Sequence, residues 1–290
     1  MSYPEHLRLE VERYLDALRF GPDTLTGGLE EAMRYSLLAG GKRVRPVLAL
    51  ATARAVGHDE RELLPLAAAI ELIHTYSLIH DDLPAMDDDD LRRGRPTNHV
   101  AFGEDVAILA GDGLYAEAFR LVLCDQRGEP GSVLRAVGEL AAATGVGGMV
   151  GGQFLDVDGG GPPGPDGLRR LHELKTGRLI RASVECVLLI AGRPEATTLA
   201  FRRFGGELGV LFQIVDDILD VTGTDDALGK PRGSDERHGK RTYVSEFGLE
   251  RARALAQASH AQARALLDEA APHGAPELAQ ITDFIHTRTA

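Results

Sequence analysis

The chain has 290 residues, of which 43% are hydrophobic, and its formal net charge is −12. This length and apolar content suffice for a sizeable core, in one large domain or two smaller ones. The acidic balance argues against a nucleic-acid-binding surface, which needs an excess of Lys and Arg. Cys124 and Cys186 are far apart and form no CxxC pair, so neither a disulfide framework nor a structural zinc site is expected.

The N-terminal segment, residues 1–18, carries several carboxylates and lacks the apolar stretch of a signal peptide. No segment is expected to approach the ~18 apolar residues that cross a bilayer. The best candidate, residues 184–191, is short and contains Glu185. A soluble, cytoplasmic protein is therefore predicted.

Apolar residues recur at spacings of three and four along most of the chain, and alternating stretches are almost absent. This pattern predicts an all-α protein, a single large helical bundle. The Gly/Pro tract 159–165 cannot continue a helix, and we interpret it as a loop inside one domain, 1–290, because the helical pattern is similar on both sides. Helices are expected at residues 5–18, 29–38, 46–56, 63–83, 106–125, 132–145, 166–191, 195–221 and 249–271.

The first acidic motif, residues 81–90, ends an otherwise apolar helix. An acidic run by itself is typical of a solvated surface or a loop. Asp81 and Asp87 are six residues apart, which puts them out of phase on a regular helix. Pro84 removes a backbone donor and clashes with the preceding turn, so we expect a kink or bulge that brings Asp87 back towards Asp81.

The second acidic motif, Asp216, Asp217 and Asp220, lies inside the apolar run 210–221. Asp216 and Asp220 are four residues apart and share one helix face, where their oxygens converge on a hard cation. Buried carboxylates are costly unless they are paired or bound to a metal. The motif therefore needs a cationic partner, either a metal ion or the basic side chain of a structural ion pair.

Taken together and in this order, the motifs resemble those of the trans-polyprenyl diphosphate synthases, the family that includes farnesyl and geranylgeranyl diphosphate synthases. The resemblance implies an all-α bundle around a central cavity, in which an allylic diphosphate is joined head to tail to isopentenyl diphosphate. It extends over nearly the whole chain and is carried by residues 40–46, 81–97, 148–153, 175–176, 212–220 and 229–243.

The resemblance also implies three Mg²⁺ ions per active site. Each substrate diphosphate carries roughly three negative charges, so two facing carboxylate clusters would repel it without divalent cations between them. By this resemblance Asp81 and Asp87 hold two of the ions and Asp216 the third. Direct or water-mediated support would come from Asp82, Asp217 and Asp220.

Two diphosphate sites follow from the same resemblance, and arginine suits both because its planar fork donates two parallel hydrogen bonds. Without the family resemblance, the basic residues at 42–45 would be interpreted as solvent-facing residues at the start of a helix, and the histidine at 74 as a core residue. The allylic diphosphate would be clamped by Arg92, Lys175, Lys230 and Lys240. Isopentenyl diphosphate would lie in a metal-free pocket made by Lys42, Arg45, His74 and Arg93.

The reaction needs no nucleophilic side chain, because bound metal ions act as Lewis acids on the leaving diphosphate. By resemblance, the carbocation would be stabilised by the Lys175 carbonyl, Thr176 and Gln213. Tyr76, about one and a half helical turns before Asp81, is large enough to close the cavity, with Ser77 beside it. In similar bacterial enzymes an aromatic residue there accompanies a fifteen-carbon product, so farnesyl diphosphate is predicted. The alternative is that Tyr76 only packs against a neighbouring helix.

Three other functions compete with this one. A geranylgeranyl diphosphate synthase would use the same chemistry. A terpene cyclase would need no isopentenyl pocket, and a non-catalytic synthase subunit would usually lack one aspartate motif, whereas this chain has both. The family commonly forms homodimers, which are expected here. Glycines at 147, 148, 151 and 152 either allow close helix approach or leave room in the cavity.

Overall fold

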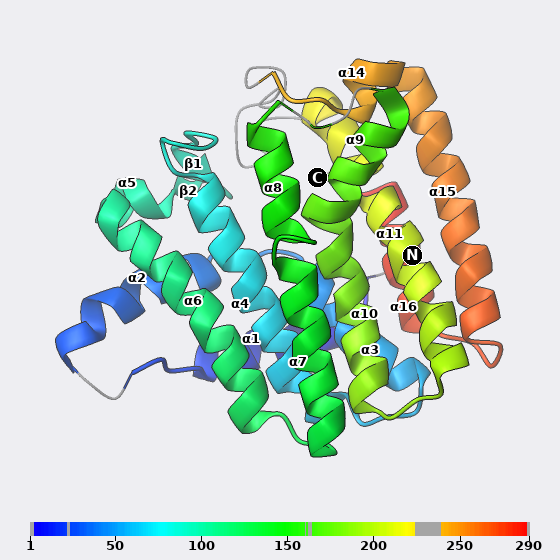
Figure 1. Cartoon of the computed structure of the whole chain (residues 1–290), viewed down its shortest axis with the longest axis horizontal. Coiled ribbons are helices and arrows are strands. Elements are labelled where there is room, and N and C mark those ends of the chain that lie inside the picture. The colour runs from blue at the N-terminus through cyan, green and yellow to red at the C-terminus, as the bar shows by residue number, and fades with distance from the viewer. Residues whose placement is uncertain (1–2, 22–23, 160, 162–163, 224–238, 289–290) are drawn as a thin grey trace.

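The computed structural model describes residues 3–21, 24–159, 161, 164–223 and 239–288. Over these residues the chain is almost wholly helical, as Figure 1 shows, and the all-α prediction is confirmed. The helices are α1 (Glu5–Ala17), α2 (Gly27–Leu37), α3 (Val44–Ala55), α4 (Leu64–Asp81), α5 (Asn98–Phe102), α6 (Glu104–Asp125), α7 (Pro130–Thr144), α8 (Met149–Val157), α9 (Gly164–His172), α10 (Arg178–Ile190), α11 (Glu195–Thr222), α14 (Tyr243–Phe247), α15 (Leu249–Ala270) and α16 (Pro276–Thr287), with 3₁₀ turns at Thr24–Thr26 and Glu60–Leu63 and a π-helical segment, η3, at Glu173–Gly177.

Helix α4 lies in the core, and α1, α2, α3, α6 and α10 pack against it. Its sequence is mostly apolar, and most of its residues are buried, among them the polar Glu71 and Thr75, which is typical of a helix inside the core. Two stretches, Glu60–Asp81 and Pro130–Val157, have the length and hydropathy of a membrane span, so the expectation that no segment comes close was wrong. In the stretch Glu60–Asp81, 67% of its apolar 18-residue segment is buried inside the protein, as is typical of a core helix.

Several elements differ from the expected ones. The first acidic motif begins where α4 ends, at Asp81, two residues before the predicted end. The predicted helix 166–191 is interrupted by η3. Four helices, α5, α8, α14 and α16, were not expected. Of these, α5, α8 and α14 have only 5, 9 and 5 residues and so carry few turns of apolar periodicity.

A short antiparallel hairpin follows the first acidic motif, with β1 (Leu91–Arg92) paired to β2 (Arg95–Pro96). The two turn residues, Arg93 and Gly94, both have positive φ, 53° and 72°, as a tight hairpin turn requires. The N–H of Thr97 closes the hairpin on the Asp90 carbonyl at 2.9 Å. The hairpin lies beside the C-terminal end of α4 (Figure 1). Its residues Arg92 and Arg93 line the same cavity as Asp81, the last residue of α4.

Segment η3 packs between α8 and α11 through two glycines. A Cβ atom on Gly152 would lie 2.2 Å from the backbone nitrogen of Lys175, and one on Gly209 would lie 2.8 Å from the Cα of Gly177. Neither distance is compatible with a side chain there. Gly152 therefore serves close helix approach, which decides the question that the sequence left open at this position.

Candidate active site

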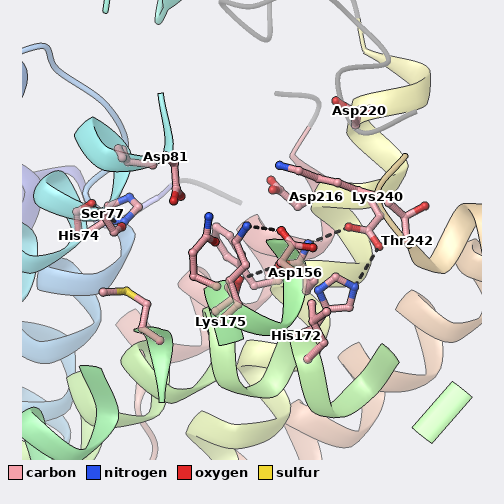
Figure 2. A pocket seen from close by; sticks show the side chains of 18 of the residues that line it. His74, Ser77, Asp81, Asp156, His172, Lys175, Asp216, Asp220, Lys240 and Thr242 are labelled. Atoms are coloured by element: carbon pink, nitrogen blue, oxygen red, sulfur yellow. Dashed lines mark hydrogen bonds and ion pairs between the residues drawn. The ribbon is translucent and has the colours of Figure 1, made fainter. Parts of the chain in front are cut away.

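A cavity of about 560 Å³ lies between the ends of α4, α8, η3 and α11. Both acidic motifs reach it, and Figure 2 shows Asp81 on one side and Asp216 and Asp220 on the other. The two clusters are thus not on separate outer surfaces. Of the residues expected to form the site, the cavity is lined by Arg45, His74, Tyr76, Ser77, Asp81, Arg92, Arg93, Lys175, Thr176, Gln213, Asp216, Asp217, Asp220 and Lys240.

The backbone turn after α4 brings the two ends of the first motif together. The N–H of Asp87 donates to the carbonyl oxygen of Asp81 at 2.8 Å, and the N–H of Asp88 donates to the Leu83 carbonyl at 3.1 Å. The expected return of Asp87 towards Asp81 is confirmed. It is achieved by ending the helix and folding the chain back, rather than by a kink within a continuing helix.

Cationic side chains already pair with the carboxylates of the first motif. Arg92 Nε lies 2.9 Å from both oxygens of Asp82, which is only 3% exposed and lines a separate small cavity. Lys240 Nζ donates to Asp87 at 2.7 Å. Burial raises the pKa of Asp81 to about 6, and the neighbouring charge of Asp87 adds to this, while Lys175 opposes it. The negative charge of Asp81 is therefore costly until a cation approaches.

The three aspartates of the second motif lie in different environments. Asp216 has 56% of its side chain exposed and pairs with Arg288 Nη2 at 3.1 Å. Asp217 is 1% exposed, and its carboxylate accepts from the Tyr243 backbone N–H at 2.6 Å and from Gln213 Nε2 at 2.7 Å. Asp220 is buried at the cavity wall. Asp216 therefore faces the cavity, whereas Asp217 also holds α14 in place.

Two polar side chains of the expected carbocation site are fixed by a hydrogen-bond chain. Thr176 Oγ1 donates to Gln213 Oε1 at 2.8 Å, and Gln213 Nε2 donates in turn to Asp217. Thr176 and Lys175 lie in η3, whose wide turn departs from the regular α-helical pattern; such segments occur frequently at functional sites. The arrangement presents oxygen dipoles of fixed orientation to the cavity.

The basic side of the cavity is formed by Arg45, His74 and Arg93. Arg45 Nη1 lies 3.4 Å from His74 Nε2, and burial lowers the pKa of Arg45 to about 10, so it remains charged at neutral pH. Burial and the positive charge of Arg45 lower the pKa of His74 well below its ordinary value. His74 is therefore a neutral imidazole that accepts a hydrogen bond from Arg45.

Two of the expected binding residues are not among those that line this cavity. Lys42 is exposed, and its ammonium lies over the Phe284 ring, 5.6 Å from the centroid. Lys230 lies outside the described residues. Arg43, interpreted from sequence alone as solvent-facing, is buried and pairs with Glu71 at 2.6 Å, so it has a structural role.

The cavity also has polar residues that sequence reasoning missed, among them Asp156 on α8 and Arg288 after α16, and it includes Gln153, which belonged to a family motif but had no role assigned. Asp156 Oδ2 accepts from Lys175 Nζ at 2.6 Å, as Figure 2 shows. Asp156 lies among the apolar residues of the stretch 154–157. An aspartate among apolar residues is also what drew attention to the second acidic motif. Arg288 has no comparable signal in the sequence.

Comparison with known proteins places this geometry in a family. The sequence pattern of the polyprenyl synthetases matches residues 27–286. The chain belongs to the polyprenyl synthetase family. The predicted family and the predicted prenyltransferase activity are confirmed.

Individual relatives agree with this membership. The chain is 49% identical to a farnesyl diphosphate synthase of Geobacillus stearothermophilus over 82% of this chain and 80% of the relative. It is 49% identical to geranylgeranyl pyrophosphate synthase 7 of Arabidopsis thaliana over 79% of this chain and 67% of that relative. Among solved structures it resembles a Helicobacter pylori geranyltransferase in complex with magnesium and isoprenyl diphosphate, with a TM-score of 0.87, 34% identity, and coverage of 98% of this chain and 97% of that one.

Proposed function

We propose that this polyprenyl synthetase joins an allylic diphosphate, dimethylallyl or geranyl, to isopentenyl diphosphate, and that its main product is farnesyl diphosphate. The observation that carries the proposal is that two carboxylate clusters and a basic pocket line the same cavity. The high identity to bacterial farnesyl diphosphate synthases supports the product. Geranylgeranyl diphosphate remains the second candidate, since a geranylgeranyl pyrophosphate synthase is equally identical.

The side chains of the cavity fit Mg²⁺. Their donor atoms are hard carboxylate oxygens, and burial has made the charge of Asp81 costly in the absence of a cation. Among the described residues, no three acidic, histidine or cysteine side chains form a ready-made metal cage. This agrees with Mg²⁺, which is commonly held by one or two carboxylates together with substrate phosphates and water.

Three Mg²⁺ ions are proposed per active site, and two oppositely placed carboxylate groups would hold them. Asp81 and Asp87 provide one side, and Asp216, supported by Asp220, provides the other. When bound, the ions withdraw charge from the leaving diphosphate as Lewis acids. Asp82 and Asp217 support the site indirectly, because Asp82 orients Arg92 and Asp217 orients Gln213.

The basic residues divide between the two diphosphates. We assign Arg92, Lys175 and Lys240 to the allylic diphosphate, because each pairs with a carboxylate at the acidic side of the cavity. Lys230 is assigned to the same diphosphate by resemblance alone. Isopentenyl diphosphate would contact Arg45, Arg93 and His74, while Lys42 must move from Phe284 to take part.

The polar groups of η3 and α11 would stabilise the carbocation. The Thr176 hydroxyl and the Gln213 carbonyl carry fixed partial negative charge in a largely buried wall. Fixed dipoles need no reorganisation when charge develops, which lowers the barrier to ionisation. The isopentenyl double bond then attacks the allylic carbon, and the released diphosphate takes the final proton.

A homodimer in the cytoplasm is also proposed, with the whole chain as one domain. Large apolar side chains are exposed on neighbouring helices at Leu109 of α6, Leu134 of α7 and Phe154 of α8, with 55%, 61% and 64% of their surface accessible. Exposed apolar surface of this kind marks interaction sites. It supplies a candidate interface, which the sequence alone did not locate.

The test is a product assay on purified protein with isopentenyl diphosphate and either dimethylallyl or geranyl diphosphate. We expect farnesyl diphosphate from both starters, and no product after treatment with a chelator until Mg²⁺ is restored. A twenty-carbon product would favour the second candidate. Absence of any condensation product with all starters would refute the proposal, and cyclised hydrocarbons would indicate a terpene cyclase.

A further inference from the structure

Arg288, just after α16, reaches the cavity from the C-terminal end of the chain. Its backbone N–H donates to the Phe284 carbonyl at 2.8 Å, which fixes it at the end of the helix. Leu278, Ile281 and Ile285 anchor α16 in the core. The well-packed helix therefore fixes the position of the Arg288 guanidinium, and the Arg288 side chain is only 11% exposed.

The guanidinium of Arg288 lies between the acidic and the basic sides of the cavity. Nη2 donates to Asp216 Oδ1 at 3.1 Å and to the Phe212 carbonyl at 3.2 Å. The same group stacks over the Phe212 ring at 4.2 Å, and Arg45 lies over that ring at 5.4 Å. The Phe212 ring thus makes cation–π contacts with two arginines, Arg288 and Arg45. Arg45 belongs to the proposed isopentenyl diphosphate pocket.

Both arginines have unused donor capacity. The Nε atoms of Arg45 and Arg288 are buried, and neither has a hydrogen-bond partner in the described parts of the chain. Buried donors without a partner are unfavourable, and two guanidinium groups this close repel each other. An anion between them would relieve both costs, because a diphosphate accepts several charge-assisted hydrogen bonds.

We propose that Arg288 is an exchangeable counter-cation: it neutralises Asp216 before the metal binds, and it turns to the diphosphate held by Arg45 once the metal displaces it. Metal binding at the second acidic motif and anion binding at the basic pocket are then coupled through one side chain. The identity of the anion in this proposal rests on the proposed function. The pairing of Arg288 with Asp216 does not depend on the proposed function.

The proposal predicts opposite effects on the two ligands when Arg288 is replaced. In Arg288→Gln, Mn²⁺ measured by electron paramagnetic resonance without substrate should bind about 2- to 5-fold more tightly, because the Arg288–Asp216 ion pair, whose carboxylate is 56% exposed, no longer competes. Isopentenyl diphosphate measured by calorimetry with saturating Mn²⁺ and no allylic substrate should bind about 10-fold more weakly, because a charged donor that the metal has released from Asp216 is lost. Arg288→Lys, which keeps the charge but not the fork, should lie between.

Arg203→Gln is the matched control, because it removes an exposed arginine that pairs with Glu269 away from the cavity, and it should change neither affinity. In an Asp216→Asn background, the effect of Arg288→Gln on Mn²⁺ should disappear. Unchanged or weaker Mn²⁺ binding in Arg288→Gln would overturn the proposal even if condensation activity is present. A loss of both affinities together with a lower melting temperature would also overturn it, since that result indicates a structural role.

Discussion

The rings of Tyr76 and Tyr115 pack edge to face beneath the cavity, with their centroids 4.8 Å apart. Tyr115 continues the contact to Phe119 at 5.1 Å, and its hydroxyl lies 3.2 Å from Thr144 Oγ1. Tyr76 lines the cavity, whereas Tyr115 lies behind it. The alternative that Tyr76 only packs against a helix is thus incomplete, because its ring contacts α6 and borders the cavity at the same time.

Replacing Tyr76 by Ala should lengthen the product beyond fifteen carbons, because the growing chain can advance to Tyr115. Chromatography of the products after phosphatase treatment measures this. Tyr76→Phe is the matched control and should keep the fifteen-carbon product, since the ring remains. An unchanged product length in Tyr76→Ala would exclude this residue as the floor, and a further extension in Tyr76→Ala/Tyr115→Ala would identify the second ring as the next barrier.

Adjacent aspartates of the second motif should respond differently to substitution. Asp216→Asn is expected to reduce kcat about 10²- to 10³-fold with little change in melting temperature, because its carboxylate faces the cavity. Asp217→Ala should also destabilise the protein by about 1–3 kcal/mol, because the Tyr243 N–H and Gln213 lose their acceptor. Steady-state kinetics and chemical unfolding distinguish the two, and equal stability of both variants would contradict the assignment.

The close contact of α8 with η3 predicts that Gly152→Ala destabilises the protein by about 1–3 kcal/mol, since the added methyl overlaps the Lys175 backbone. It should also lower kcat, because η3 carries Lys175 and Thr176. Gly138→Ala, within α7, is the matched control: apart from its chain neighbours and the adjacent backbone of α7, a Cβ atom on Gly138 would meet no atom within 4 Å, so the change should be neutral or slightly stabilising. Thermal unfolding of both variants tests the contrast.

Burial lowers the pKa of His172 to about 4, and Lys175 contributes in the same direction while Asp156 opposes it. In the unfolded chain this histidine titrates near its ordinary value, about 6.5. The neutral His172 side chain therefore contributes fully to the free energy of unfolding above pH ~6.5. As the pH falls towards 4 this contribution, about 3 kcal/mol in total, is lost. In His172→Gln, the free energy of unfolding should fall less over this window; parallel curves for the variant and the wild type would contradict the expectation.

The long helices were predictable because each repeats its apolar pattern over several turns. The expected helices 195–221 and 249–271 correspond to α11 and α15 within one residue at each end. The hairpin was missed because two-residue strands show no alternation. Segment η3 was missed because one extra residue per turn leaves no mark in an otherwise helical composition.

The site was predictable where chemistry is local in the sequence. Aspartates inside an apolar run signal a need for cations, and this identified the second motif with Asp216, whereas the role of Asp81 followed from the family resemblance. Their actual partners come from distant positions: Arg288 is 72 residues from Asp216, and Lys240 is 153 residues from Asp87. Such pairings depend on tertiary packing, and neither basic residue carries a local pattern that names its partner.

Segment η3 also sets the rotational phase of the helical stretch that it interrupts. Each residue of an α-helix advances the side chain by about 100°, and a wide turn takes up one additional residue, so the helix after it escapes the rotation of about 100° that regular winding would impose. Upstream, Leu168 and Leu171 are buried, and downstream Leu179 and Ile180 are buried as well. Winding the same residues as a regular α-helix would swing the apolar face of α10 away from the core by about 100°, so the geometry of the reaction chamber and the register of the bundle are inseparable.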